Sequence, residues 1–218
     1  VAGMFGLFFL GVLYLQEVLG YDALQTGFAF LPTTLVMGTL SVKFSEPLIM
    51  RFGARNCLIV GLVLIAIGLA LFARVPVDGN YWTDVLPSTL LLGSGVGVCF
   101  PSLMTLAMSG ATKTDAGLAS GLVNTTAQVG AAIGLAVLAT IAANKTDALT
   151  AAGKPHAEAL VGGYEIAFWV AAGLVVVALI VAFIVLEPAR APEGQEGEPT
   201  GPDGMTEAEL EAEAGTTL

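Results

Sequence analysis

Charged side chains are scarce in this sequence. They make up 12% of its 218 residues, whereas 56% of the residues are hydrophobic. Average soluble domains carry about 25% charged residues, so a soluble fold of this size could not bury so much apolar surface. The mean hydropathy of +0.83 points the same way. This composition excludes a soluble domain and predicts an integral membrane protein.

Histidine and cysteine, which often bind metals or take part in catalysis, are also nearly absent. The single histidine, His156, lies in a polar stretch without a second ligand nearby, and the two cysteines, Cys57 and Cys99, lie in different hydrophobic runs. We interpret the cysteines as small buried hydrophobic residues. The Gly93-x-Gly95-x-Gly97 run does not follow a strand, so it indicates helix packing and not a nucleotide site. We therefore expect no cofactor, no metal site, no nucleic-acid partner and no enzymatic activity.

Acidic residues outnumber basic ones, but most of the difference lies at one end of the chain. The net charge is −10, and from Glu187 onward there are nine acids and one base, Arg190, a net of −8. We predict a six-helix transmembrane bundle in residues 1–187 and a disordered, acidic cytoplasmic tail in residues 188–218. Because Val1 already lies in an apolar run without signal-peptide features, we expect this sequence to be the C-terminal part of a longer protein.

Charged residues divide the predicted bundle into six charge-free windows. Most are close to the roughly 20 residues that a helix needs to cross a bilayer core of about 30 Å. None alternates apolar and polar residues as a barrel strand would, so we predict an all-α fold with six transmembrane helices. The polar stretch from Lys145 to Gly163 is predicted to be an external loop. The windows are Val1–Gln16, Ala23–Val42, Asn56–Ala73, Val85–Thr112, Ala116–Asn144 and Ile166–Leu186.

Basic residues in the short loops predict the orientation of the bundle, because they favour the cytoplasmic side. Lys43, Arg51, Arg55, Lys113 and Arg190 would lie on one side of the membrane, and Arg74, Lys145 and Lys154 on the other. We therefore predict a plasma-membrane protein. Its C-terminus and the loop between its second and third helices are predicted to lie in the cytoplasm.

The window Ala116–Asn144 is not uniformly apolar. The residues Ser120, Val123, Ala127, Gly130 and Gly134 recur every three or four positions and form a face on which a second helix could approach closely. We predict that this face contacts the missing half of the protein; the alternative is that its small residues pack within this bundle and the neighbouring amides bond to adjacent helices. A neighbouring face carries Gly117, Gly121, Asn124 and Gln128, and its two amides would be costly to expose to lipid. This pattern is typical of a helix inside a bundle.

Three stretches are notable for their order and spacing: Tyr14–Pro32, Ser45–Asn56 and Thr114–Gly130. Together on six helices, they resemble the C-terminal half of a major facilitator superfamily transporter, in the branch of fourteen-helix drug–proton antiporters. The resemblance covers Val1 to Leu186. It implies that the first and fourth helices line a cavity, the second and fifth flank the other half, and the third and sixth face lipid.

The second of these stretches resembles the family's cytoplasmic loop motif but departs from it. Arg51, Gly53 and Arg55 match, whereas Glu46 stands where the family has its first glycine and Met50 where it has an aspartate. A charge lock through that aspartate is therefore in doubt, although Glu46 could replace it. The arginines could pair with carboxylates or helix C-termini of a neighbouring bundle. The alternative is that they only set the topology.

The resemblance implies a proton-coupled exporter of small amphipathic molecules, embedded in the lipid bilayer and working by alternating access with the missing N-terminal half. A proton carrier must be protonatable, and Glu17 at the end of the first helix is the candidate; the alternative is a solvated glutamate. A non-transporting membrane scaffold or sensor remains the second functional class. The predicted substrate-cavity residues are Tyr14, Gln16, Ser94, Gly97, Pro101, Asn124 and Gln128, and the predicted packing glycines are Gly93, Gly117, Gly121, Gly130 and Gly134.

Overall fold

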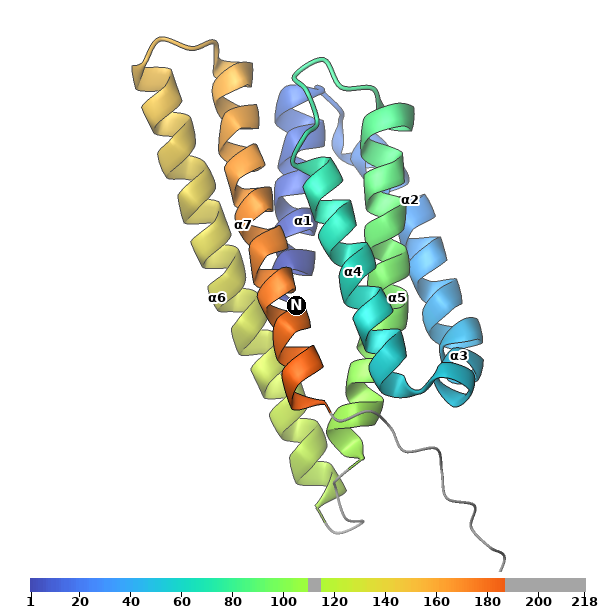
Figure 1. The fold of residues 1–218 in the computed structure, drawn as a ribbon. Coiled ribbons are helices and arrows are strands. Elements are labelled where there is room, and N and C mark those ends of the chain that lie inside the picture. The colour runs from blue at the N-terminus through green and yellow to red at the C-terminus, as the bar shows by residue number, and fades with distance from the viewer. Residues whose placement is uncertain (110–114, 187–218) are drawn as a thin grey trace, which may run out of the picture. The chain divides into compact units, whose positions relative to one another are not determined.

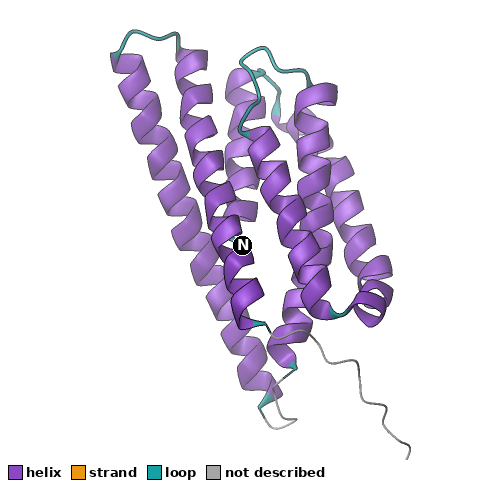
Figure 2. Cartoon of the chain, in the orientation of Figure 1, coloured by secondary structure: helices purple, strands orange, loops and turns teal. Residues whose placement is uncertain are grey.

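Helices form nearly all of the described chain. A computed structural model describes residues 1–109 and 115–186, and helices are their only regular secondary structure (Figure 2). Residues Val1–Leu186 form one compact unit. The predicted tail, and the residues Lys113 and Arg190 used to predict the orientation, lie outside the described residues.

Ten helical elements follow one another along these residues. Five segments are long and apolar enough to cross a membrane, and Ala2–Val18 is a shorter apolar helix. The predicted all-α membrane fold is thereby confirmed. The elements are α1 (Ala2–Leu13), η1 (Tyr14–Val18), α2 (Ala23–Thr39), η2 (Leu40–Phe44), α3 (Ser45–Phe52), α4 (Ala54–Phe72), η3 (Tyr81–Val85), α5 (Leu86–Met108), α6 (Ala116–Ala151) and α7 (His156–Val185), where η marks a π-helical turn.

The long helices pack side by side in an order that differs from their order in the sequence. α5 lies between α2 and α4, α4 packs on α7, and α7 pairs with α6, while α1 contacts α4, α6 and α7 (Figure 1). An aromatic cluster fills the space between α1, α4 and α7. The Phe72 ring lies 5.8 Å from the Tyr14 ring and 4.9 Å from the Phe168 ring, measured between ring centroids in edge-to-face geometry. Such pairs each contribute about 0.5–1.5 kcal/mol beyond the area they bury.

Two local features set helix boundaries. The Asp22 carboxylate accepts the Gln25 backbone N–H at 2.7 Å, and the Gln25 side chain accepts the Asp22 N–H at 3.1 Å. This capping box satisfies two N–H groups that the first turn of α2 leaves without helical partners. Gly53 ends α3 with a φ of 82°, a conformation that suits glycine, so that α4 can start at once in a new direction.

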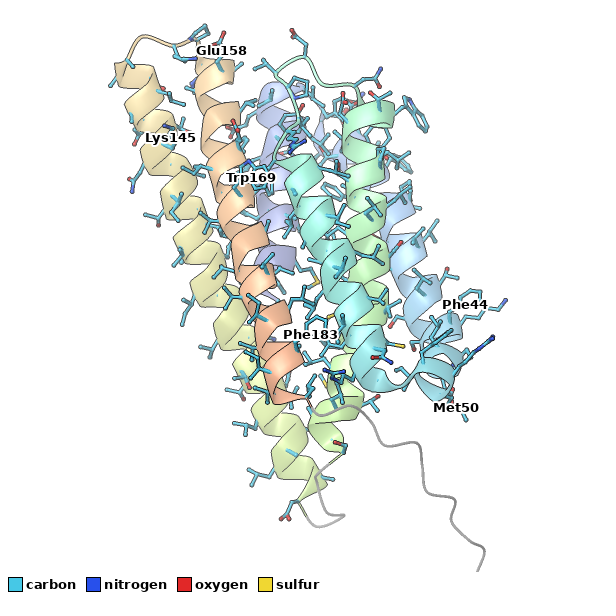
Figure 3. The ribbon with its side chains drawn as sticks, viewed as in Figure 1. Phe44, Met50, Lys145, Glu158, Trp169 and Phe183 are labelled. Atoms are coloured by element: carbon cyan, nitrogen blue, oxygen red, sulfur yellow. The ribbon has the colours of Figure 1, made fainter. Side chains whose placement is uncertain are left out.

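The predicted external loop Lys145–Gly163 is wrong in extent. α6 continues to Ala151, and α7 already begins at His156. Charged residues do not end these helices; they mark where the helices leave the apolar core. The 36 residues of α6 extend about 54 Å at 1.5 Å per residue, well beyond a bilayer core of about 30 Å. Lys145 on α6 and Glu158 on α7 lie toward this protruding end (Figure 3).

α5 approaches both of its neighbours at glycines. A Cβ atom on Gly95 would lie 2.7 Å from the carbonyl oxygen of Gly61 in α4, and one on Gly93 would lie 2.9 Å from the carbonyl oxygen of Thr33 in α2. Membrane helices use such small residues to bring their backbones together. These contacts hold α5 closely between α2 and α4.

Candidate functional site

The first helix contributes two of the predicted cavity residues, and the structure places them differently. Tyr14 is 2% exposed, and its hydroxyl donates a hydrogen bond to the Pro76 carbonyl oxygen at 2.8 Å. In this conformation Tyr14 joins α1 to the segment after α4 and offers almost no surface to a substrate. Gln16, two residues further along, is partly exposed.

The three predicted cavity residues on α5 share one helical face by their spacing of three and four. Ser94 is partly exposed and donates its hydroxyl to the Leu90 carbonyl oxygen at 2.8 Å. Gly97 is buried, and a Cβ atom there would lie 2.7 Å from the Met37 carbonyl oxygen of α2. Pro101 is partly exposed. This face therefore borders α2, and Gly97 is a close packing contact.

The predicted residues of α6 divide into an open set and a packed one. Asn124 and Gln128 are exposed, and a Cβ atom added at Gly117, Gly121 or Gly130 would meet no atom within 4 Å. Gly134 instead packs against Ala2 of α1. The expectation that Gly134 contacts the missing half is therefore wrong, because α6 crosses α1 of its own unit at this level.

Two grooves are present in the described unit, and none of the seven predicted cavity residues lines either of them. The apolar groove, of about 580 Å³, lies between α4, α5, α6 and α7 beside the first residues of α1. Its lining includes the Thr126 hydroxyl, which already donates to the Leu122 carbonyl oxygen. The mixed groove, of about 330 Å³, lies between α1, α6 and α7 and carries Thr146, Asp147 and Tyr164 along with apolar residues.

Glu17 lies in the π-helical turn that follows α1. The Leu19 N–H donates to the Tyr14 carbonyl oxygen at 3.1 Å, five residues back, which is the bond that defines a π-turn. The Glu17 side chain is exposed, and η1 contacts α7. Such turns are frequent at functional sites, and this one places the candidate carboxylate against a neighbouring helix.

The loop motif of residues 46–55 joins two helix ends. The Arg55 Nη2 donates to the Phe183 carbonyl oxygen in the last turn of α7 at 3.4 Å, and the guanidinium lies 5.7 Å from the centroid of the Phe183 ring. A cation at a helix C-terminus is favourable because carbonyl groups there lack helical partners. Arg55 thus contacts a helix of its own unit.

Of the other motif positions, Glu46, Met50 and Arg51 are exposed, and Gly53 is partly exposed. The Arg51 guanidinium lies 5.4 Å from the centroid of the Phe52 ring, and Glu46 lies in the first turn of α3. Met50, at the aspartate position of the motif, is 81% exposed, and it lies at the α3 end of the bundle with Phe44 (Figure 3).

Tyr164 is a buried residue lining the mixed groove that the sequence pattern missed. It lies between the predicted loop Lys145–Gly163 and the predicted helix Ile166–Leu186, so it belonged to neither predicted element. A longer helical pattern would have found it, because Leu160, Tyr164 and Phe168 repeat every four residues and are all buried. Within the part of the chain that is described, no group of three or more His, Cys, Asp or Glu residues could hold a metal ion.

Comparison with known proteins supplies independent evidence. The family model described as the Major Facilitator Superfamily matches residues 1–135. The puromycin resistance protein of Streptomyces alboniger is 33% identical over 191 residues, which are 85% of this chain and 38% of that protein. The cephamycin export protein of Amycolatopsis lactamdurans is 37% identical over 139 residues, or 64% of this chain and 28% of that protein.

A third relative is the multidrug resistance protein Stp of Mycobacterium tuberculosis. It is 32% identical over 155 residues, which are 71% of this chain and 28% of that protein. The chain therefore spans between 28% and 38% of the length of these three relatives.

Proposed function

Since this chain belongs to the major facilitator superfamily, we propose that it supplies one of the two helical bundles of a secondary active transporter that exports small amphipathic molecules. The observation that carries this proposal is the similarity to resistance and export proteins over as much as 85% of the chain. The alternative class, a non-transporting scaffold or sensor, is not favoured, because these relatives are named for resistance or export.

A second bundle would dock on α2 and α6. In their most apolar stretches of 18 residues, 17% of the residues are buried in the segment that contains α2 and 22% in α6, against 39% in α4. α6 also exposes Asn124 and Gln128, whose amides are costly to leave in lipid. A partner bundle on this side, with a hydrated substrate cavity between the two bundles, would cover the apolar surface of α2 and α6 and give the two amides polar surroundings.

We further propose that protons are the coupling ions and that Glu17 binds them. A coupled proton must bind a group that can change its protonation state within the transport cycle. Glu17 is exposed and lies in the π-helical turn η1, between α1 and α2, which also contacts α7. A charge change on this carboxylate would therefore occur where α1 and α7 come together.

Efflux by the full-length protein tests the proposed function. Puromycin or ethidium is added as a probe outside everted membrane vesicles, in which export appears as uptake. An imposed proton gradient is expected to drive uptake of the probe at least about tenfold faster than in vesicles without the protein. Collapse of the gradient with a protonophore is expected to remove the difference. Probe movement that is the same with and without the protein would contradict the transporter assignment for these probes, and binding without movement would favour a sensor.

The orientation is tested by accessibility of single cysteines. Met50 in α3 and Ala151 at the end of α6 are exposed, whereas both native cysteines are buried. In Figure 1, α3 and the turn that joins α6 to α7 lie at opposite ends of the bundle. In a full-length background without Cys57 and Cys99, Met50→Cys is expected to react with a membrane-impermeant maleimide only from the cytoplasmic side. Ala151→Cys should react only from the external side. Reaction of both from one side would contradict the proposed topology.

A further inference from the structure

The Thr33 hydroxyl of α2 is buried without a hydrogen-bond partner. Its side chain is 0% exposed and packs against Gly93 of α5, and among the described residues no group bonds to the hydroxyl oxygen. Two other threonines of α2 show the usual arrangement, because the hydroxyls of Thr26 and Thr34 donate to carbonyl oxygens four residues earlier, at 2.8 and 3.1 Å. A buried hydroxyl without a partner is costly, so the exception at Thr33 needs a physical reason.

The acceptors that Thr33 would use already bind other hydroxyls. A threonine hydroxyl in a helix donates to the carbonyl oxygen three or four residues earlier, which here means Phe30 or Ala29. The Phe30 carbonyl oxygen accepts the Thr34 hydroxyl, and the Ala29 carbonyl oxygen accepts the Tyr81 hydroxyl at 2.7 Å. A carbonyl oxygen has two lone pairs, and in a helix one of them serves a backbone N–H. Tyr81 and Thr33 therefore compete for the second lone pair of Ala29.

The bond from Tyr81 to Ala29 fastens α2 to another part of the bundle. Tyr81 is the first residue of η3, which leads into α5. α2 packs mainly on α5 and lies at the edge of the bundle (Figure 1). It is also one of the two helices on which a second bundle is proposed to dock. The bond therefore holds the first half of an edge helix against η3.

Pro32 lies next to the competing donor in the sequence. A proline inside a helix has no N–H and leaves the carbonyl oxygen four residues earlier, here that of Phe28, without its helical bond. Helices bend most readily at such a point. A bond from Thr33 to Ala29 would span the same turn and brace it, as threonine hydroxyls do beside prolines in membrane helices. Tyr81 thus ties α2 to η3, whereas Thr33 would tie α2 to itself.

We propose that the Ala29 carbonyl oxygen is an exchangeable contact: Tyr81 donates to it in this conformation, and Thr33 replaces Tyr81 when η3 releases α2. The exchange breaks one O–H···O bond and forms another to the same oxygen. The buried Thr33 hydroxyl gains a partner, and the Tyr81 hydroxyl, on a partly exposed residue, turns to water. α2 can then move relative to η3 on the side of the proposed second bundle. The role in transport rests on the proposed function; the exchange itself does not.

A double-mutant cycle on the thermal unfolding of the full-length protein tests the exchange. Because Thr33 replaces the lost donor, Tyr81→Phe is expected to leave the unfolding temperature within about 0.5 °C of wild type. Thr33→Val keeps the shape of the side chain and removes the unpartnered hydroxyl, so it is expected to raise that temperature. In the Thr33→Val protein no donor can replace Tyr81, and Tyr81→Phe should lower the temperature by at least about 1 °C.

Tyr14→Phe is the matched control for Tyr81→Phe. The Tyr14 hydroxyl donates to the Pro76 carbonyl oxygen at 2.8 Å, so this variant also removes a phenolic hydrogen bond to the segment between α4 and α5 or its neighbours. It is expected to lower the unfolding temperature equally in the wild-type and Thr33→Val proteins. The exchange is overturned if Tyr81→Phe has equal effects in the two backgrounds, or if Tyr14→Phe couples to Thr33→Val as strongly as Tyr81→Phe does.

The rate of gradient-driven efflux tests the role in transport. Thr33→Val removes the replacement donor and makes release of α2 less favourable, so turnover is expected to fall at least about threefold, as for the loss of one hydrogen bond. Thr33→Ser keeps a hydroxyl at the same place and should stay within about twofold of wild type. Normal turnover in Thr33→Val, or equal losses in the valine and serine variants, would overturn the role of the exchange in transport.

The two measurements separate this inference from the proposed function. If the thermal cycle shows the coupling but the full-length protein moves no probe, the exchange at Ala29 holds and the proposed function fails. If the protein exports the probe and the thermal effects of Tyr81→Phe and Thr33→Val are additive, the proposed function holds and this inference fails.

Discussion

A leucine at Gly95 is expected to prevent the bundle from folding. A Cβ atom at this position would lie 2.7 Å from the Gly61 carbonyl oxygen and 2.9 Å from the Ile65 backbone nitrogen. Overpacking a core that can adjust its side chains costs about 1–3 kcal/mol. Here the obstacles are backbone atoms of α4, so α4 and α5 would have to separate. We expect a cost of at least about 3 kcal/mol, a large part of the roughly 5–15 kcal/mol by which folded proteins are stable.

Gly130→Leu is the matched control for Gly95→Leu. Gly130 is also a glycine within a long membrane helix, but a Cβ atom there would meet nothing within 4 Å. We expect the full-length Gly130→Leu protein to elute as a monodisperse species from size-exclusion chromatography and to unfold near the wild-type temperature, whereas Gly95→Leu should aggregate. Under the proposed docking on α6, Gly130→Leu should nevertheless lose transport. Normal stability of Gly95→Leu would show that the contact between α4 and α5 is not as close as described.

Glu17→Gln is expected to abolish efflux driven by a proton gradient and to leave binding of the exported probe within about twofold of wild type. Glutamine keeps the size of the side chain, but it cannot bind and release a proton near neutral pH. The change therefore removes the titration and preserves the packing of η1 against α7. The measurement is probe movement in proteoliposomes with an imposed gradient, together with equilibrium binding in detergent.

Glu165→Gln is the control for Glu17→Gln. Glu165 is the residue after Tyr164, is exposed, and lies toward the same end of the bundle. Its neutralisation changes the local charge by the same amount and is expected to leave gradient-driven efflux within about twofold of wild type. Full efflux by Glu17→Gln, or equal losses in both variants, would exclude a specific role for Glu17 and favour the alternative that it is a solvated glutamate.

The fold class could be predicted because the bilayer restricts the possible structures. Within lipid, backbone groups must bond within the protein, so a charge-free run of spanning length can only be a helix or a closed barrel strand. The extents of α6 and α7 could not be predicted in this way. Lys145 and Asp147 are charged but remain in helical geometry beyond the apolar core, where water solvates their side chains. Charge indicates where a helix leaves lipid, and not where it ends.

The site was less predictable, because its geometry depends on contacts between distant elements. The π-turn at Tyr14–Val18 has no signature in a pattern based on α-helical periodicity, and it contacts α7, which lies far along the sequence. The bond from Arg55 to the Phe183 carbonyl oxygen likewise joins distant parts of the chain and was not predicted. The cavity residues on α1, α5 and α6 remain predictions, since their role depends on a second bundle.

The burial along α6 is uneven, and this bears on local unfolding. Its buried residues are Ala131, Gly134, Leu138 and Ala142, so all four lie in one stretch of 12 residues, whereas the stretch 116–130 contains none. The free energy needed to open a helix locally rises with the apolar contacts that opening would break. Opening should therefore be much easier in residues 116–130 of this unit than in residues 131–142. A surface that covers Asn124 and Gln128 would raise the opening free energy of the first stretch and leave that of the second nearly unchanged.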